Sequence, residues 1–311
     1  MALHVPVMCR EILTLLAPSL SAPGAILLDA TLGLGGHSLA ALERFDSATV
    51  IGIDRDPEAI EAATERLAPY TGRFEIHQAV YDEIPAILGG RRADAVLFDL
   101  GLSSLQIDSA PRGFAYSVDA PLNMRMDADE SRLTAADVVN TYPVEDLVRI
   151  FRKYGEEKYA VRIAQAIAAA REHEPFSTSA RLVDVIASAV PPGQTRGHPA
   201  KRVFQAIRME VNDERTHLEK ALPEALESLA LNGRMAVLSY HSGEDRLIKQ
   251  VFAHAVSDHV PPGMAMVPDG SQARFRLVVH GALKPSEDEM ADNPRSQSAR
   301  LRVIERIKED R

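Results

Sequence analysis

Glycines and acidic residues near the N-terminus have the spacing of a site for a nucleotide-like ligand. One apolar run ends at Asp29 and is followed by Gly33, Gly35 and Gly36, and a second apolar run ends at Asp54. Glycine allows positive φ angles and lets the backbone approach a ligand that any Cβ would block. Asp54 lies 19 residues after Gly35, near the separation at which an acid meets ribose hydroxyls in βαβ units. This arrangement predicts an adenosine-type ligand.

The same loop lacks the sequence motif of dinucleotide-binding enzymes. The pattern GxGxxG would place its third glycine at position 38, where the chain has Ser38. The phosphate-binding pattern GxxxxGK[ST] does not occur in the sequence either. A pyrophosphate site is therefore disfavoured.

The elements that must position this loop alternate between strand and helix. Apolar runs predict strands at 25–29, 48–54, 73–80 and 93–101, and a helical pattern with proline at its first position covers 57–69. Such alternation is typical of a parallel, doubly wound α/β sheet. In sheets of this kind ligands bind at the carboxyl ends of the strands.

The strand pattern is then interrupted. From about residue 105 to 198 the sequence contains several helical patterns and no convincing buried strand. We interpret residues 108–198 as a helical subdomain for substrate recognition. It is inserted into a sheet domain made of residues 1–107 and 199–311.

The sheet resumes after the insertion. The sequence predicts a long helix over 203–231, a strand over 233–241 and a further helix over 243–256. Two late strand candidates, RFRLVVHG and ARLRVIERI, have no clear crossover helix between them. Such a pair is expected to be antiparallel and to lie at the edge of the sheet.

The composition is that of a globular protein in a reducing compartment. The single cysteine, Cys9, rules out internal disulfides and a zinc site built on several thiolates. The apolar N-terminal stretch carries Arg10 and Glu11 and is interrupted by prolines, so neither a signal peptide nor a membrane-spanning helix is expected. We therefore expect a cytoplasmic protein without a metal site. The net charge of -9 argues against indiscriminate binding of nucleic acid.

Polar side chains follow the predicted strands at the edge where a ligand would bind. They are Asp29, Asp54, Tyr81, Asp99, Ser103, Ser104, Gln106, Tyr240, His241 and Ser242. Each of them alone would be interpreted as a turn or capping residue. Their occurrence at the ends of four strands favours a shared site.

Several long segments resemble one enzyme family. They are HVPVM, DATLGLGGHS, GIDRDPEAI, DLGLSS, RGFAY, DAPLNMRMD, FRKYGEEKYA, RVFQAIRMEVNDE, LSYHSGEDR and NPRSQSARLR. They are similar to those of the MraW/RsmH family, bacterial methyltransferases that use S-adenosylmethionine to methylate N4 of a cytidine in the decoding region of 16S ribosomal RNA. The resemblance implies a Rossmann-like class I methyltransferase sheet with an inserted helical subdomain. It also implies that 16S ribosomal RNA within the small ribosomal subunit is the partner.

The resemblance implies a cofactor role for residues in the motifs quoted above. Gly35, Gly36 and His37 would line the methionine part of S-adenosylmethionine, and Asp54 would bind its ribose. Tyr81 stands where the family commonly has a phenylalanine against the adenosine. A surface tyrosine at the end of a strand is the alternative for this position.

Two further residues would complete the cofactor pocket and border the target base, namely Asp99 and Gln106. Positive charge moves to N4 during methyl transfer, and a fixed carboxylate nearby would stabilise that change. Asp99 is our candidate for this catalytic role. His241 is a second candidate, as a proton acceptor with a pKa near neutrality, and a structural histidine is the alternative.

A basic segment is the candidate for RNA binding. Residues 194–208 contain Arg196, Lys201, Arg202 and Arg208 and no acid. On the predicted long helix, Arg208 and Asn212 would share one face, because residues four apart are neighbours on a helix surface. A solvated helix face is the alternative interpretation.

Two other functions remain open from the residues alone. A nicotinamide oxidoreductase is disfavoured by Ser38 and by the late strand pair. A non-catalytic RNA-binding module would need the basic segment but not the set formed by Gly35, Asp54 and Asp99. The sequence predicts nothing about the oligomeric state.

Overall fold

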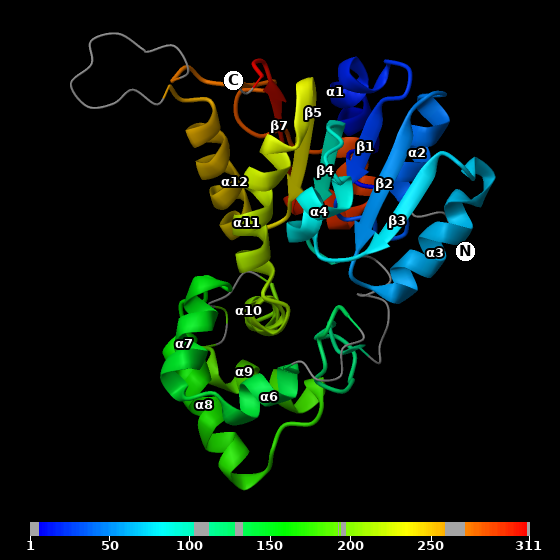
Figure 1. Cartoon of the computed structure of the whole chain (residues 1–311). Helices are drawn as coiled ribbons and strands as arrows, with labels where there is room; N and C mark the ends of the chain where they lie inside the picture. The colour runs from blue at the N-terminus through cyan, green and yellow to red at the C-terminus, as the bar shows by residue number, and fades with distance from the viewer. Residues whose placement is uncertain are drawn as a thin grey trace. The chain divides into compact units, whose positions relative to one another are not determined.

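A computed structural model of the chain describes residues 6–102, 112–127, 133–191, 193, 197–258 and 271–309. The chain divides into two compact units. Figure 1 shows the chain coloured by residue number. The sheet unit comprises Met1–Gly101 and Thr216–Arg311, and the helical unit comprises Leu102–Arg215.

The sheet unit is built on seven strands in the order β3-β2-β1-β4-β5-β7-β6. The strands are β1 (Ile26–Asp29), β2 (Thr49–Asp54), β3 (Phe74–Gln78), β4 (Ala93–Asp99), β5 (Leu229–Ser239), β6 (Phe275–Leu277) and β7 (Arg300–Arg306). The first five pair in parallel, and β7 is antiparallel to both β5 and β6. The predicted parallel sheet with an antiparallel pair at its edge is confirmed.

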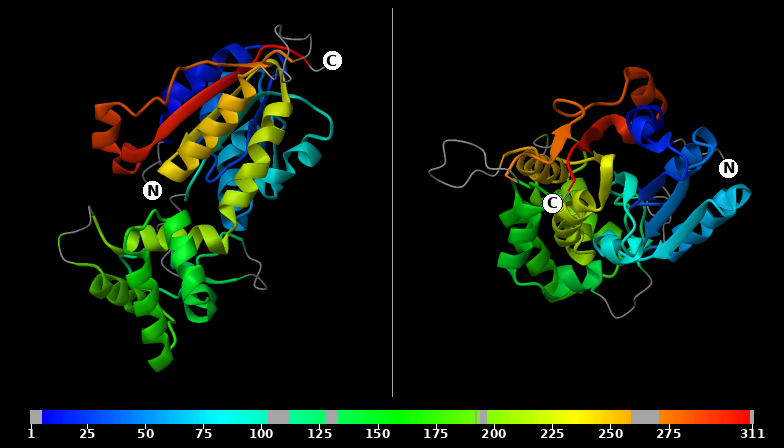
Figure 2. Two further views of the ribbon diagram at one scale, coloured as in Figure 1. Left: turned by 90° about the vertical axis from the view of Figure 1, so that its left-hand side faces the viewer. Right: turned by 45° about the horizontal axis from the view of Figure 1, so that its top comes forward.

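Helices cover both faces of this sheet (Figures 1 and 2). They are α1 (Cys9–Leu20), α2 (Gly36–Arg44), α3 (Pro57–Leu67), α4 (Ile84–Leu88), α11 (Glu214–Glu227), α12 (Ser242–Ala255) and α13 (Glu287–Asp292). Consecutive strand residues point to opposite faces. Leu27 accordingly packs with α1 and α2, while Leu28 packs with α4, α11 and α12. Burial on both faces explains why the strands are continuous apolar runs.

The helical unit has a core of its own. It contains α6 (Ala135–Thr141), α7 (Val144–Lys153), α8 (Ala160–His173), α9 (Ser179–Ala189) and α10 (Ala200–Val211). These helices bury one continuous apolar cluster. The helical patterns predicted in this part of the chain are confirmed by α6, α7, α8 and α9.

The predicted long helix over 203–231 is wrong. The chain instead forms α10, breaks at Asp213, which has a φ of 47°, resumes as α11 and enters β5 at Leu229. A positive φ at a residue other than glycine cannot continue a right-handed helix. The spacing of apolar residues does not predict this break, because the helices on either side of it both bury an apolar face.

The expected domain boundaries also differ from the compact units. The helical unit begins at Leu102 and ends at Arg215, whereas we expected 108–198. Helix α10 belongs to the helical unit because Val203, Phe204 and Ile207 are buried in its apolar cluster. Packing of this helix, rather than the turn residues that precede it, sets the boundary.

Candidate functional site

The loop between β1 and α2 has the backbone conformation expected from its glycines. Gly33 and Gly35 have φ angles of 51° and 71°, which glycine adopts without a steric penalty. Gly35 immediately precedes α2, whose first amides lack partners within the helix. A Cβ on Gly35 would lie 3.3 Å from Cβ of Ala63 on α3. Glycine at position 35 therefore lets the loop pack closely against α3. The sequence motif alone did not reveal this packing role.

Asp54 lies at the end of β2 and binds the glycine loop. Its Oδ2 accepts a hydrogen bond of 2.8 Å from the Gly33 N–H, and its Oδ1 accepts one of 3.0 Å from the Asp56 N–H. Burial raises the pKa of this carboxyl above its usual value. A carboxylate has about four acceptor positions, so about two are left for a ligand. Asp54 can therefore hold the loop and still receive a pair of hydroxyl donors.

Asp29, at the end of β1, is buried beneath the same loop. Its Oδ2 accepts a hydrogen bond of 2.7 Å from the Ser38 hydroxyl, and its Oδ1 accepts one of 3.3 Å from the Thr31 N–H. Burial raises its pKa. Ser38, the residue that departs from the dinucleotide motif, thus holds a buried carboxyl of the site.

Asp99 ends β4 and is bonded from the next strand. The Tyr240 hydroxyl, just after β5, donates a hydrogen bond of 2.8 Å to Asp99 Oδ1. Asp99 Oδ2 lies 3.7 Å from Nδ1 of His37, and the Asp99 N–H donates to the Thr31 hydroxyl at 2.6 Å. The Asp99 side chain is 26% exposed, against 6% for His37. A fixed carboxylate is therefore accessible at the ligand edge of the sheet.

His37 lies on α2, close behind Asp99. Its Nε2 is 3.0 Å from the carbonyl oxygen of Val7. A carbonyl oxygen only accepts, so Nε2 is the donor in this bond. This bond fixes the ring with Nδ1 toward Asp99.

The carboxyls of Asp54, Asp29 and Asp99 end β2, β1 and β4, which are neighbours in the sheet. Parallel strands bring these ends to one edge. Such an edge favours a cationic ligand with hydroxyl donors, since carboxylates attract positive charge and accept hydrogen bonds.

Tyr81 begins a 3-10 helix (Tyr81–Glu83) that follows β3. Its ring packs edge to face on Phe98 of β4, with centroids 5.8 Å apart. The ring is partly exposed, so an aromatic surface is present near the end of β3. Gln106, like Ser103 and Ser104, lies outside the described residues.

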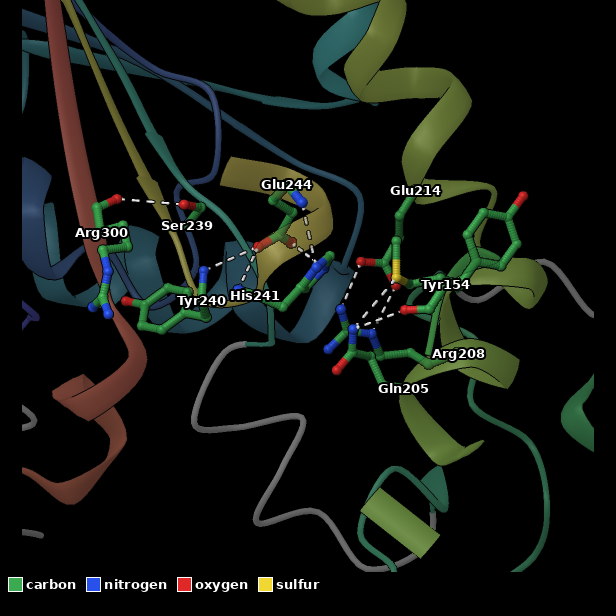
Figure 3. A network of polar contacts seen from close by, with 10 residues as sticks. Tyr154, Gln205, Arg208, Glu214, Ser239, Tyr240, His241, Glu244 and Arg300 are labelled. Atoms are coloured by element: carbon green, nitrogen blue, oxygen red, sulfur yellow. Dashed lines mark hydrogen bonds and ion pairs between the residues drawn. The ribbon is translucent and has the colours of Figure 1, made fainter. Parts of the chain in front are cut away.

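His241 caps helix α12. Its Nδ1 accepts a hydrogen bond of 3.3 Å from the Glu244 N–H, and its Nε2 is 3.0 Å from Glu244 Oε1 (Figure 3). The Glu244 carboxylate in turn accepts from the Tyr240 N–H at 3.0 Å. A ring that accepts at Nδ1 carries its proton on Nε2 when neutral, and a second proton would break the cap. This geometry favours the structural alternative for His241.

Two residues expected to bind RNA have structural partners within the helical unit. The Arg208 guanidinium forms two hydrogen bonds with the Glu214 carboxylate, of 2.8 and 2.9 Å, and both side chains are 11% exposed (Figure 3). The buried Asn212 amide donates to the carbonyl oxygens of Met124 and Arg208 and accepts from the Met126 N–H. Asn212 is the C-cap of α10, and its N–H donates to the Arg208 carbonyl oxygen at 3.1 Å, so the two residues are neighbours at the end of the helix although their side chains have different partners.

The remaining cations of the basic segment lie at the start of α10. Lys201 and Arg202 are exposed, and the Arg202 guanidinium donates to the carbonyl oxygen of Glu156 at 3.1 Å. Arg196 lies outside the described residues. The exposed positive charge is therefore concentrated in the first turn of this helix.

Neither a metal centre nor a membrane span is present in the part of the chain that the structure describes. No three histidine, cysteine, aspartate or glutamate side chains there are grouped to hold a metal ion. None of its helices has the length and apolar character needed to cross a bilayer.

Comparison with known proteins gives full-length matches. Residues 1–307 match the MraW methylase family. The chain is 54% identical to ribosomal RNA small subunit methyltransferase H of Streptomyces avermitilis, over 99% of this chain and 98% of that protein. It is 53% identical to the protein of the same name from Thermobifida fusca, over 98% of this chain and 94% of that protein.

Proposed function

The chain belongs to the MraW methylase family, and from this premise we propose that it methylates N4 of a cytidine in the decoding region of 16S ribosomal RNA. The resemblance found in the sequence is confirmed, and the protein is a methyltransferase that uses S-adenosylmethionine. The nicotinamide oxidoreductase and the non-catalytic module are set aside. The observation that carries the proposal is the identity of 54% to a small-subunit ribosomal RNA methyltransferase over nearly the whole chain.

The residues at the ligand edge of the sheet fit S-adenosylmethionine. The cofactor carries a sulfonium, an ammonium and a ribose with two hydroxyls, and at this edge the carboxyls of Asp54 and Asp99 are partly exposed while that of Asp29 is buried. Asp54 would accept from the ribose hydroxyls, since about half of its acceptor positions are free of backbone donors. Tyr81 would lie against the adenine, and Gly35, Gly36 and His37 would line the methionine part. When bound, the cofactor supplies an electrophilic methyl group.

Asp99 is the residue we assign to the chemistry. The lone pair of cytosine N4 is delocalised into the ring, so the amine must be oriented and the positive charge that develops on it must be stabilised. A carboxylate that accepts a hydrogen bond from N4 does both. The Tyr240 hydroxyl and the Thr31 hydroxyl fix Asp99, so the carboxylate needs little reorganisation during the reaction.

The helical unit, Leu102–Arg215, is assigned to recognition of the RNA. A base in a folded ribosomal RNA must be splayed out to be modified, which requires contacts to the flanking backbone. Lys201 and Arg202 are exposed and suit phosphate contacts, whereas Arg208 and Asn212 maintain the fold of this unit.

Methyl transfer to isolated small subunits tests the proposal. Small subunits that lack the modification are incubated with the protein and labelled S-adenosylmethionine, and the digested nucleosides are separated by mass and retention. The expected product is N4-methylcytidine at a decoding-region position. Label in 5-methylcytidine, in a ribose methyl group or at another position would contradict the assignment, and the Asp99→Asn variant serves as the background control.

A further inference from the structure

A pair of stacked aromatic rings lies on the surface of the helical unit. The rings of Tyr116 and His198 are 4.8 Å apart between centroids, with 18° between their planes. Tyr116 also packs edge to face on the buried Phe204, at 6.1 Å and 78°. His198 is exposed. The Tyr116 ring is therefore anchored to the core, and the His198 ring stacked on it reaches solvent.

The orientation of the exposed ring is fixed by more than stacking. His198 Nδ1 accepts a hydrogen bond of 3.2 Å from the Ala200 N–H, and the His198 carbonyl oxygen accepts from the Lys201 N–H at 3.1 Å. A ring held on one face and at one nitrogen loses little conformational freedom when a ligand stacks on it. Low ordering cost is what makes a preorganised surface bind well.

The segment that carries this ring is positively charged. Lys201 and Arg202 follow His198 in the first turn of α10, and residues 197–208 include no acid. Cations at this end of a helix are disfavoured by the helix macrodipole, so Lys201 and Arg202 do not stabilise α10. An aromatic surface beside lysine and arginine is the arrangement by which proteins bind single-stranded nucleic acid, through base stacking and phosphate contacts.

We propose that His198 is a stacking platform for one unpaired base of the RNA, and that Lys201 and Arg202 bind the adjacent phosphates. The inference rests on the proposed function, since it concerns the same RNA. It goes further in naming a site on the helical unit that holds a nucleotide other than the reacting one. Every ring has two faces, and Tyr116 covers only one face of His198.

Two substitutions separate the contribution of the His198 ring from that of its hydrogen bond with the Ala200 N–H. His198→Asn keeps an acceptor for the Ala200 N–H and removes the ring, whereas His198→Phe keeps a ring and removes the acceptor. His173, an exposed histidine at the end of α8 in the same unit, supplies the matched control His173→Ala. Lys201→Gln removes one charge beside the platform and leaves the ring in place.

The probe is a mixed-sequence, single-stranded oligoribonucleotide that carries 2-aminopurine, whose fluorescence is quenched by stacking. His198→Asn should weaken binding about tenfold and reduce the quenching, while His198→Phe and His173→Ala stay near the wild type. The salt dependence of binding should be unchanged in His198→Asn, and its slope should fall by about one in Lys201→Gln.

The outcomes separate this inference from the proposed function. Weakening by Lys201→Gln with no effect of His198→Asn overturns the platform and leaves a phosphate-only surface. Weakening by His198→Phe without weakening by His198→Asn also overturns it, because the acceptor for the Ala200 N–H and not the ring would then matter. If His198→Asn weakens RNA binding as expected but the wild-type protein transfers no methyl group to small subunits, the proposed function is refuted and the platform is supported.

Discussion

The Tyr240 hydroxyl donates a hydrogen bond of 2.8 Å to Asp99 Oδ1 and so joins the ends of two neighbouring strands. Burial, and then the negative charge of Asp99, raise the pKa of Tyr240 well above its usual value of 10.0. The phenol therefore stays protonated across the working range of pH and remains a donor. Tyr240 is a positioning residue, which orients Asp99 without a role in bond making.

Tyr240→Phe should lower methyl transfer more than cofactor binding. A hydrogen bond to a charged group contributes about 1.5 to 3 kcal/mol, and we expect at least about tenfold loss in the single-turnover rate. The measurement is single-turnover transfer at saturating cofactor, with Kd from calorimetry. Tyr70→Phe is the matched control, because Tyr70 is partly exposed and the contact of its ring with the Arg73 guanidinium does not need the hydroxyl. Equal rates in Tyr240→Phe and wild type would show that Asp99 does not depend on Tyr240.

Asp99→Asn tests the charge of the carboxylate itself. The amide keeps the size and one acceptor oxygen but cannot stabilise the positive charge that develops on N4. The rate of single-turnover transfer should fall much further than the cofactor affinity, because only the transition state loses the interaction. If only the affinity falls, Asp99 is a cofactor ligand and the catalytic group lies elsewhere.

Asp54→Ala should weaken binding of S-adenosylmethionine by about 1.5 to 3 kcal/mol, the contribution of a hydrogen bond to a charged group. Calorimetry on the folded variant measures this difference, and Asp46→Ala, at an exposed aspartate of the same unit, is the control. Unchanged affinity in Asp54→Ala would remove this residue from the cofactor site.

Cofactor affinity should also depend on pH through Asp54. Its pKa in the folded protein is raised above 3.8, so as acid is added the carboxylate takes up a proton at a higher pH than an ordinary aspartate does. The protonated group accepts hydrogen bonds less well, and affinity should therefore fall with decreasing pH, starting above 3.8. Titrating the Kd in wild type and in Asp54→Asn checks this, since the variant should lack that loss.

Arg208 and Glu214 should stabilise the helical unit rather than bind RNA. Removing one partner takes two hydrogen bonds from a nearly buried charge, so Arg208→Met and Glu214→Gln should each cost about 1.5 to 3 kcal/mol. The double variant should cost less than the two together. Amide hydrogen exchange in α10 and α11 measures the loss. Asp146→Asn, which removes an exposed ion pair in the same unit, should cost less than about 1 kcal/mol.

The RNA-binding slope offers an independent check on Arg208. Arg208→Met should leave the salt dependence of RNA binding unchanged, because its guanidinium is engaged by Glu214. A slope reduced as strongly as in Lys201→Gln would show that Arg208 does contact phosphate.

The sequence by itself determined the architecture of the sheet unit and the edge of the sheet at which its acidic strand ends meet. Apolar runs and helical spacings are local patterns, set by which face of each element is buried, so the strands ending at Asp29, Asp54 and Asp99 could be predicted. Glycine at positions 33 and 35 likewise indicated the loop, because its backbone has positive φ there. The family resemblance supplied the reaction, which no spacing encodes.

Only the tertiary structure decided which polar groups meet. Tyr240 reaches Asp99 because β5 lies beside β4, and Arg208 meets Glu214 across the break in the helix at Asp213. Arginine is therefore nearly buried in an ion pair at position 208 and exposed at position 202. The sequence specifies the chemistry of each side chain. The partners of that side chain depend on packing between elements far apart in the chain, and local periodicity does not predict them.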